Sequence, residues 1–265
     1  MEFTIALVQF KPVQKNVAHN IQKIQSLLQG IQADLTVLPE LANSGYLYPS
    51  KESLIPFSEP ANGRGPFLTA LRELATHTKG VIVSGYAELA NNHLYNSAIA
   101  ISIESVLANY RKTHLYAGEK SLFLPGDSGF RTITWKNVCI GMMVCFDWIF
   151  PESARTLALA GAQIIAHPAN LVLPYCQNAM ITRSIENKVF TITANRIGLE
   201  KLGEQKLTFT GQSQITGPKG EINYRGPKNK STVHVMTIDP EKASDKTINP
   251  QNDLFLDRRP EIYEI

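Results

Sequence analysis

Cysteine is scarce in this chain, and what is scarce or missing excludes several classes of protein. The 265 residues include three cysteines, Cys139, Cys145 and Cys176, and this odd count at irregular spacing argues against a disulfide framework. It predicts a reducing, cytoplasmic location. The longest apolar run, residues 138–146, is too short to cross a bilayer, and the N-terminal stretch lacks the basic and apolar regions of a signal peptide. We therefore expect no membrane-bound role.

An excess of one charge sign is also missing. The formal net charge is +3, with 26 Lys and Arg against 23 Asp and Glu spread along the chain, so no nucleic-acid partner is expected. The sequence has no glycine-rich phosphate loop and no Gly-x-Ser-x-Gly turn. Cys139 and Cys145 have the wrong gap for a zinc site, so no metal is expected. His167 lies inside an apolar strand-like run and is interpreted as a hydrogen-bonded core histidine.

What the chain does have is the make-up of an ordinary folded domain. The hydrophobic fraction is 43% and the charged fraction 18%, and a chain of this length can bury its core without disulfides or metals. No break in composition suggests a second domain. We expect one domain over residues 1–243. A polar tail over residues 244–265 is expected to pack on something outside its own core, most simply a partner subunit.

Predicted helices alternate with predicted strands, but hairpins interrupt the alternation, so we expect an α+β fold with a mixed sheet covered by helices. Helices are expected after Asn16 (ending near Gly30), from Pro66, from Pro151 and over residues 180–187. Strands are expected over residues 3–10, 34–38, 81–86, 94–101, 106–110, 130–135, 138–144, 163–167, 189–194, 209–214, 222–224 and 232–238. Residues 111–129 are predicted to form a long loop, and long loops in compact domains are often functional.

Three reactive groups each follow an apolar, strand-like run: Glu40, Lys112 and Cys145. Taken singly, they could be a surface carboxylate, part of a solvated basic loop and a buried structural cysteine, and Glu119 could be a salt-bridge partner in a loop. Together, a thiol, an acid and a cation are the minimum for covalent catalysis at a carbonyl-like carbon. The residues after Cys145 predict a sharp turn from strand to helix, which leaves backbone N–H groups free for a developing oxyanion.

The order of these motifs resembles that of the nitrilase (carbon–nitrogen hydrolase) superfamily over nearly the whole chain, closest to its small archaeal-type nitrilase and amidase branch. The matching segments are Leu38-Pro39-Glu40 with Gly45-Tyr46, residues 110–115 with Gly118-Glu119, residues 123–126, Cys145-Phe146-Asp147 with Phe150-Pro151-Glu152, and residues 167–170. The resemblance implies a four-layer α-β-β-α sandwich. It also implies a homodimer or larger homo-oligomer that pairs through outer helices, with the C-terminal tails contributing.

The resemblance also implies a role for each motif. Cys145 would be the nucleophile, its thiolate favoured by a neighbouring ammonium, and Glu40 the general base. Lys112 and the backbone N–H of Phe146 would hold the oxyanion, and Glu119 would orient Lys112 and the substrate nitrogen. No cofactor is needed. The residues expected to bind the substrate form a compact pocket with an aromatic wall: Phe146, Tyr46, Trp148 and Asn170.

One departure from the family pattern bears on the substrate. Many amidases and carbamoylases of this family carry an arginine four positions after the cysteine, whereas this chain has Ile149. The change removes a bidentate partner for a substrate carboxylate. We therefore expect a small neutral aliphatic amide as substrate and not an N-carbamoyl amino acid. The alternatives left open are a nitrilase acting on small aliphatic nitriles or dinitriles, a carbamoylamine hydrolase, an acyltransferase and a catalytically silent binding relative.

Overall fold

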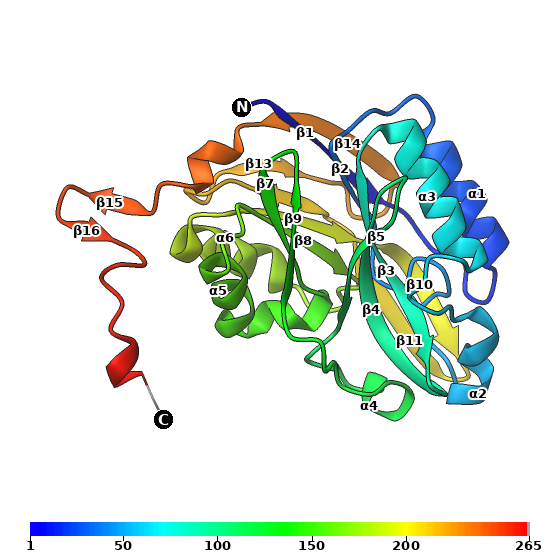
Figure 1. The fold of residues 1–265 in the computed structure, drawn as a ribbon. Helices are drawn as coiled ribbons and strands as arrows, with labels where there is room; N and C mark the ends of the chain where they lie inside the picture. The colour runs from blue at the N-terminus through cyan, green and yellow to red at the C-terminus, as the bar shows by residue number, and fades with distance from the viewer. Residues whose placement is uncertain (264–265) are drawn as a thin grey trace.

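The computed structural model describes residues 1–263, and most of its strands belong to two six-stranded sheets (Figure 1). The first sheet contains β1 (Phe3–Gln9), β2 (Leu35–Val37), β3 (Val81–Ala90), β4 (His93–Ile101), β5 (Val106–Arg111) and β14 (Thr232–Ile238). The second contains β6 (Arg131–Trp135), β7 (Val138–Met142), β8 (Ile164–Ala169), β9 (Phe190–Asn195), β12 (Gln214–Thr216) and β13 (Ile222–Arg225). Their strand orders are β14-β1-β2-β3-β4-β5 and β13-β12-β9-β8-β7-β6.

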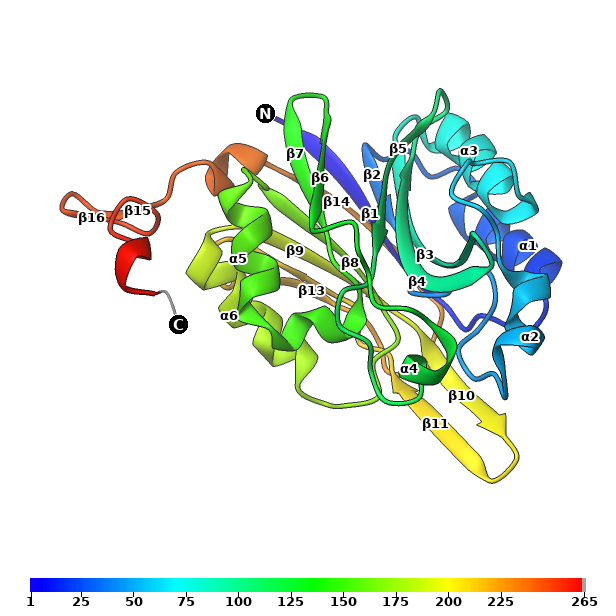
Figure 2. The same cartoon turned by 60° about the horizontal axis from the view of Figure 1, so that its bottom comes forward.

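Two pairs of helices cover the outer faces of these sheets (Figures 1 and 2). Helices α1 (Val17–Leu28) and α3 (Pro66–Thr78) pack on the first sheet, and α5 (Pro151–Leu159) and α6 (Cys176–Asn187) pack on the second. The predicted four-layer α-β-β-α sandwich is therefore confirmed. Two short helices, α2 (Lys51–Leu54) and α4 (Glu119–Leu122), lie in the connections.

The period-two pattern of β1 shows how the layers are held together. Ile5 and Leu7 belong to the apolar core between the two sheets, while Val8 and Phe10 belong to a second core under α1 and α3. A strand buried on both faces reads as a nearly continuous apolar run, which is what residues 3–10 present. Burial of both faces therefore places this strand in an inner layer, between the outer helices and the second sheet.

Local sequence signals place several element ends as predicted. The Asn16 side chain accepts a hydrogen bond from the His19 N–H at 3.0 Å and so caps α1, and Pro66 and Pro151 open their helices. The hairpin between β6 and β7 turns at Lys136 and Asn137, with φ of 48° and 64°, as expected for the mirror-image turns that suit two-residue hairpins.

The predicted strand over residues 209–214 is wrong. A strand ends at Thr210 and β12 begins only at Gln214, because Gly211 and Gln212, with φ of 58° and 52°, turn the chain between them. The first of these strands, β11 (Gln205–Thr210), pairs instead with β10 (Ile197–Leu202). This hairpin belongs to neither large sheet and projects from the molecule in Figure 2.

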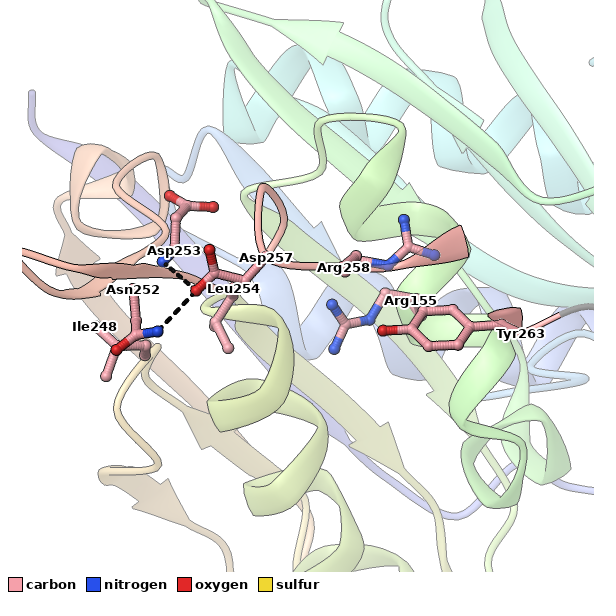
Figure 3. Close-up of a pocket in the computed structure, with 8 residues that line it drawn as sticks. All are labelled: Arg155, Ile248, Asn252, Asp253, Leu254, Asp257, Arg258 and Tyr263. Atoms are coloured by element: carbon pink, nitrogen blue, oxygen red, sulfur yellow. Dashed lines mark hydrogen bonds between the residues drawn. The ribbon is translucent and has the colours of Figure 1, made fainter. Parts of the chain in front are cut away.

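The C-terminal stretch leaves the body of the domain, as Figure 1 shows. A small hairpin, β15 (Thr247–Asn249) and β16 (Asn252–Asp253), precedes Leu256 and Ile262, whose side chains are 85% and 60% exposed. A hollow of about 470 Å³ lies between Arg155 of α5 and this stretch. Figure 3 shows the residues that line it. The expected packing of the tail on a partner subunit stays a prediction. No helix within residues 1–263 has the length and apolar character needed to cross a membrane.

Candidate active site

The three motifs converge between the two sheets. Glu40 follows β2 and Lys112 follows β5 in the first sheet, whereas Cys145 follows β7 in the second. The Lys112 ammonium donates to Glu40 Oε1 at 2.7 Å and to the Glu119 carboxylate at 2.8 Å, and all of these side chains are buried. The Cys145 side chain is buried as well, and the charges of Glu40, Lys112 and Glu119 all act on its pKa. The structure thus brings together the four residues predicted to be catalytic.

Cys145 lies at the sharp turn expected from the sequence. After Met143 and Val144, which follow β7, a short 3₁₀ turn over Cys145–Ile149 leads into α5. Cys145 has φ of 43°, a left-handed conformation that costs a non-glycine residue about 1–3 kcal/mol. The first hydrogen bond of the turn runs from the Asp147 N–H to the Val144 carbonyl at 3.1 Å. The Phe146 N–H lies one residue before this first bond. N–H groups at the start of a helical turn have no partner within the turn, so this one is available to an oxyanion.

Asp147 holds the strained turn in place. One carboxylate oxygen accepts from the Val144 N–H at 2.8 Å and from the Tyr110 hydroxyl at 2.7 Å. The other accepts from the backbone N–H of His114 at 3.2 Å and lies 2.8 Å from its ring Nδ1. Because Tyr110 and His114 belong to the lysine motif, Asp147 joins that motif to the turn that carries Cys145.

His167 holds the same turn from the second sheet. Burial lowers its pKa to about 4, so the imidazole is neutral at physiological pH. Its Nε2 lies 2.9 Å from the Cys145 carbonyl, which only accepts, so Nε2 donates, and Nδ1 lies 3.1 Å from the Thr193 hydroxyl. The interpretation of His167 as a hydrogen-bonded core histidine is confirmed.

The resting sulfur is a neutral thiol. Burial and the Glu40 carboxylate raise the pKa of Cys145 well above its usual value, while Lys112 and the backbone N–H of Asn170 lower it by less. The Lys112 ammonium favours the thiolate, as expected, but burial and the Glu40 charge outweigh it in the resting site. A nucleophile in this state needs a base beside it.

Glu40 has a free oxygen for that purpose. Its Oε1 accepts from Lys112 and from Asn96 Nδ2, each at 2.7 Å. Its Oε2 is buried and has no hydrogen-bond partner within residues 1–263. A buried carboxylate oxygen without a donor is an available proton acceptor.

The ammonium between the two carboxylates keeps its proton. Burial lowers the pKa of Lys112, but Glu119 and Glu40 reverse that effect and leave it raised. Burial raises the pKa of Glu119, and Lys112 opposes the rise. Lys112 is thus a fixed positive charge beside the sulfur. In the part of the chain that the structure describes, no group of three or more His, Cys, Asp or Glu side chains is placed to hold a metal.

Tyr46 supports Glu119. Its hydroxyl donates to Glu119 Oε1 at 2.7 Å, and its ring meets Phe209 of β11 edge-on with centroids 5.8 Å apart. Burial, with the nearby carboxylates, raises the pKa of this hydroxyl well above its usual value, so it keeps the proton that it donates. Tyr46 therefore contacts Glu119 directly and holds its carboxylate in place.

A buried ion pair at the base of the projecting hairpin, between Arg196 just before β10 and Glu200 within it, fixes Tyr46 in turn. Glu200 of β10 accepts from the backbone N–H groups of Tyr46 at 2.9 Å and Leu47 at 2.8 Å, and it pairs with Arg196, which is fully buried. Sequence reasoning missed both Glu200 and Arg196. The available signal was weak, because charged residues in a strand with many exposed positions usually face solvent.

A small cavity opens beside the sulfur, with a volume of about 20 Å³. It is lined by Tyr116, Cys145, Phe146, Trp148, Asn170, Leu171, Val172 and Leu173. Three of the four residues predicted to bind substrate line this cavity, whereas Tyr46 does not, and Ile149 lies outside the lining with 42% of its surface exposed. Sequence reasoning missed Tyr116 and residues 171–173, which directly follow recognised motifs. Within residues 1–263, no acidic or basic side chain lines the cavity.

The fold and this buried cysteine site define a class of enzyme, the hydrolases of carbon–nitrogen bonds. The family model described as carbon-nitrogen hydrolase matches residues 4–246, so the chain belongs to the carbon–nitrogen hydrolase family, whose members act on non-peptide C–N bonds.

Individual relatives carry both amidase and nitrilase names. A nitrilase from Pyrococcus abyssi is 42% identical over 262 residues, covering 98% of each chain. An (R)-stereoselective amidase from a Pseudomonas species is 30% identical, covering 96% of this chain and 91% of the relative. The crystal structure of an amidase from a Nesterenkonia species has a TM-score of 0.79 at 25% identity, covering 98% of this chain and 95% of that one. The predicted superfamily and fold are thereby confirmed.

Proposed function

We propose that this enzyme hydrolyses small neutral aliphatic amides to a carboxylic acid and ammonia, through a thioester on Cys145. The observation that carries the proposal is the buried Glu40–Lys112–Glu119 cluster beside a neutral thiol and a cavity lined by uncharged groups. An uncharged lining favours a neutral substrate, because burying a substrate charge without a partner would weaken binding by about 3–5 kcal/mol.

Acylation begins with proton transfer from the Cys145 thiol to the free Oε2 of Glu40 as the sulfur attacks the amide carbon. The carbonyl oxygen becomes an oxyanion and is held by the Lys112 ammonium and the Phe146 N–H; losing one such donor typically lowers turnover about 10²–10³-fold. The tetrahedral species then collapses, Glu40 returns the proton to the nitrogen, and ammonia leaves. The product of this half is an acyl thioester on the sulfur.

Deacylation repeats these steps with water. Glu40 takes a proton from water as the water oxygen attacks the thioester carbon, and the same two donors hold the oxyanion. Collapse expels the sulfur, Glu40 returns the proton to it, and the carboxylic acid leaves. Glu119, held by Tyr46, orients the ammonium and the substrate nitrogen throughout.

A nitrilase is the second candidate, favoured by the 42% identity to the relative named nitrilase. A nitrile would give a thioimidate, which takes up water and loses ammonia to reach the same thioester.

A carbamoylamine hydrolase has relatives too, such as the N-carbamoylputrescine amidase of Solanum lycopersicum at 30% identity. A cationic substrate would need acidic groups that the cavity lining of the described residues lacks. The intact cluster argues against a silent binding protein.

The direct test is ammonia release from propionamide, butyramide, malononitrile and an N-carbamoyl amino acid. We expect turnover of the neutral compounds, its loss in Cys145→Ala, and wild-type rates in the matched control Cys139→Ala, whose side chain lies on β7 away from the cavity. Preference for the anionic carbamoyl compound would contradict the argument from the uncharged lining. Wild-type rates in Cys145→Ala would contradict the mechanism. The cytoplasmic location and the homodimer are further parts of the proposal, the second testable by light scattering.

A further inference from the structure

Asn170 is a buried side chain with unused hydrogen-bonding capacity. It follows β8 and is 2% exposed, and neither its Nδ2 nor its Oδ1 has a hydrogen-bond partner within residues 1–263. A buried polar group that stays unpaired destabilises the fold, so a partner supplied by the substrate would be favoured. Asn195, at the end of the neighbouring strand β9, is the contrast: it accepts from the Leu171 N–H at 2.9 Å and donates to the Thr210 hydroxyl at 3.0 Å.

The position of Asn170 says where on a substrate its partner would lie. Its side chain lines the small cavity together with Cys145, and its backbone N–H acts on the sulfur. In the proposed mechanism, the reacting carbonyl oxygen is held by Lys112 and Phe146, and the nitrogen faces Glu119. The Asn170 amide is therefore left for the acyl side of the substrate.

The chemistry of an amide narrows the choice of partner. Asn170 offers N–H donors and a carbonyl acceptor, and a partner that satisfies both must itself accept and donate. A carboxylate or a nitrile only accepts, and an ammonium only donates. A hydroxyl or a carboxamide does both.

We propose that Asn170 binds a hydroxyl or carboxamide on the acyl chain, so that preferred substrates are small α-hydroxy amides or short diamides, ahead of plain alkyl amides. This inference rests on the proposed amide hydrolysis and adds the substrate class. A site built to hydrogen-bond a polar group rejects the analogue that lacks it, because the buried groups of the site are then left unpaired.

The test compares kcat/KM for lactamide and malonamide with that for propionamide and butyramide. In the wild-type enzyme we expect the polar amides to be favoured by at least about tenfold, which corresponds to about 1.4 kcal/mol. In Asn170→Leu, which has a similar size without polar atoms, we expect that ratio to fall to about one. Whichever of lactamide and malonamide is faster identifies the hydroxyl or the carboxamide as the group bound.

Two results would overturn this inference. One is a wild-type ratio near one, which needs no variant and stands even if Asn170→Leu does not fold. The other is an equal loss on polar and alkyl amides in Asn170→Leu, which would place the side chain on the reacting amide itself. In both cases Cys145-dependent hydrolysis of propionamide would still uphold the proposed function, whereas turnover of no amide at all would refute that function separately.

Discussion

Replacing Lys112 with methionine tests whether the buried charge cluster is held together as described. Methionine keeps the length and apolar stem of the side chain but removes the ammonium, which is fully buried and contacts Glu40 at 2.7 Å and Glu119 at 2.8 Å. Both carboxylates then accept hydrogen bonds from neutral donors only. Asn96 still donates to Glu40 at 2.7 Å, and Tyr46 still donates to Glu119 at 2.7 Å.

The size of the effect follows from this arrangement. Removing one partner of a buried ion pair lowers the free energy of unfolding by about 3–5 kcal/mol. Because each carboxylate keeps a neutral donor, we expect a loss at the lower end of this range, about 3 kcal/mol. The cost depends on pH. Burial already raises the pKa of Glu119, and loss of Lys112 raises it further, so the folded variant binds protons that the unfolded chain has released. Its stability therefore falls as pH rises through that interval, and the difference from wild type is larger at pH 8 than at pH 5.

Urea unfolding followed by circular dichroism, at one protein concentration and at several pH values, measures this difference. Lys120→Met is the matched control, because Lys120 is an exposed lysine of the nearby helix α4 and its loss should change stability by less than about 0.5 kcal/mol. A Lys112→Met variant as stable as this control at pH 8 would refute the reasoning. So would a stability loss that grows as the pH falls.

Three further substitutions test the surroundings of the cluster. Tyr46→Phe removes the hydrogen-bond donor to Glu119. A hydrogen bond to a charged group contributes about 1.5–3 kcal/mol, so we expect steady-state kinetics to show kcat about tenfold lower, with KM less affected. An unchanged kcat would contradict this. Glu200→Gln leaves a buried guanidinium without its counter-charge, and thermal unfolding should show a loss of about 3 kcal/mol; a variant as stable as wild type would contradict the pairing. Glu40→Gln should abolish hydrolysis. It should also lower the pKa of Cys145, because the Glu40 charge adds to the rise in that pKa caused by burial. Alkylation of Cys145 by iodoacetamide should then begin at lower pH than in the wild-type enzyme, and a shift to higher pH would contradict this.

The strands and helices of the two large layers could be predicted because their signals are local. Apolar periodicity marked β1 and β14, Asn16 and Pro151 marked helix starts, and Lys136-Asn137 marked a hairpin. The β10–β11 hairpin was missed because exposed, half-buried and buried positions follow no regular alternation along its two strands. The arrangement of the strands into two sheets came from the family resemblance, since local patterns do not specify which strands pair.

The site shows the same division between local and distant information. Glu40, Lys112 and Cys145 could be singled out because each follows a strand-like run in a recognisable motif. The protonation state of the thiol could not, because it depends on how completely the pocket is buried and on how close Glu40 lies. Glu200 could not be singled out either, since its partners Tyr46 and Leu47 lie about 150 residues earlier in the chain.

The pairing of β1 with β14 has a consequence for synthesis. Phe3 pairs with Ile238 and Gln9 with Thr232, so β1 acquires this neighbour only after all the strands between them in the sequence have been made. At 5–20 residues per second, that delay is on the order of tens of seconds. During it, one edge of the nascent β1 has no strand beside it, and such an edge invites pairing with other chains. Chaperone demand for this enzyme should therefore be concentrated before residue 238 emerges.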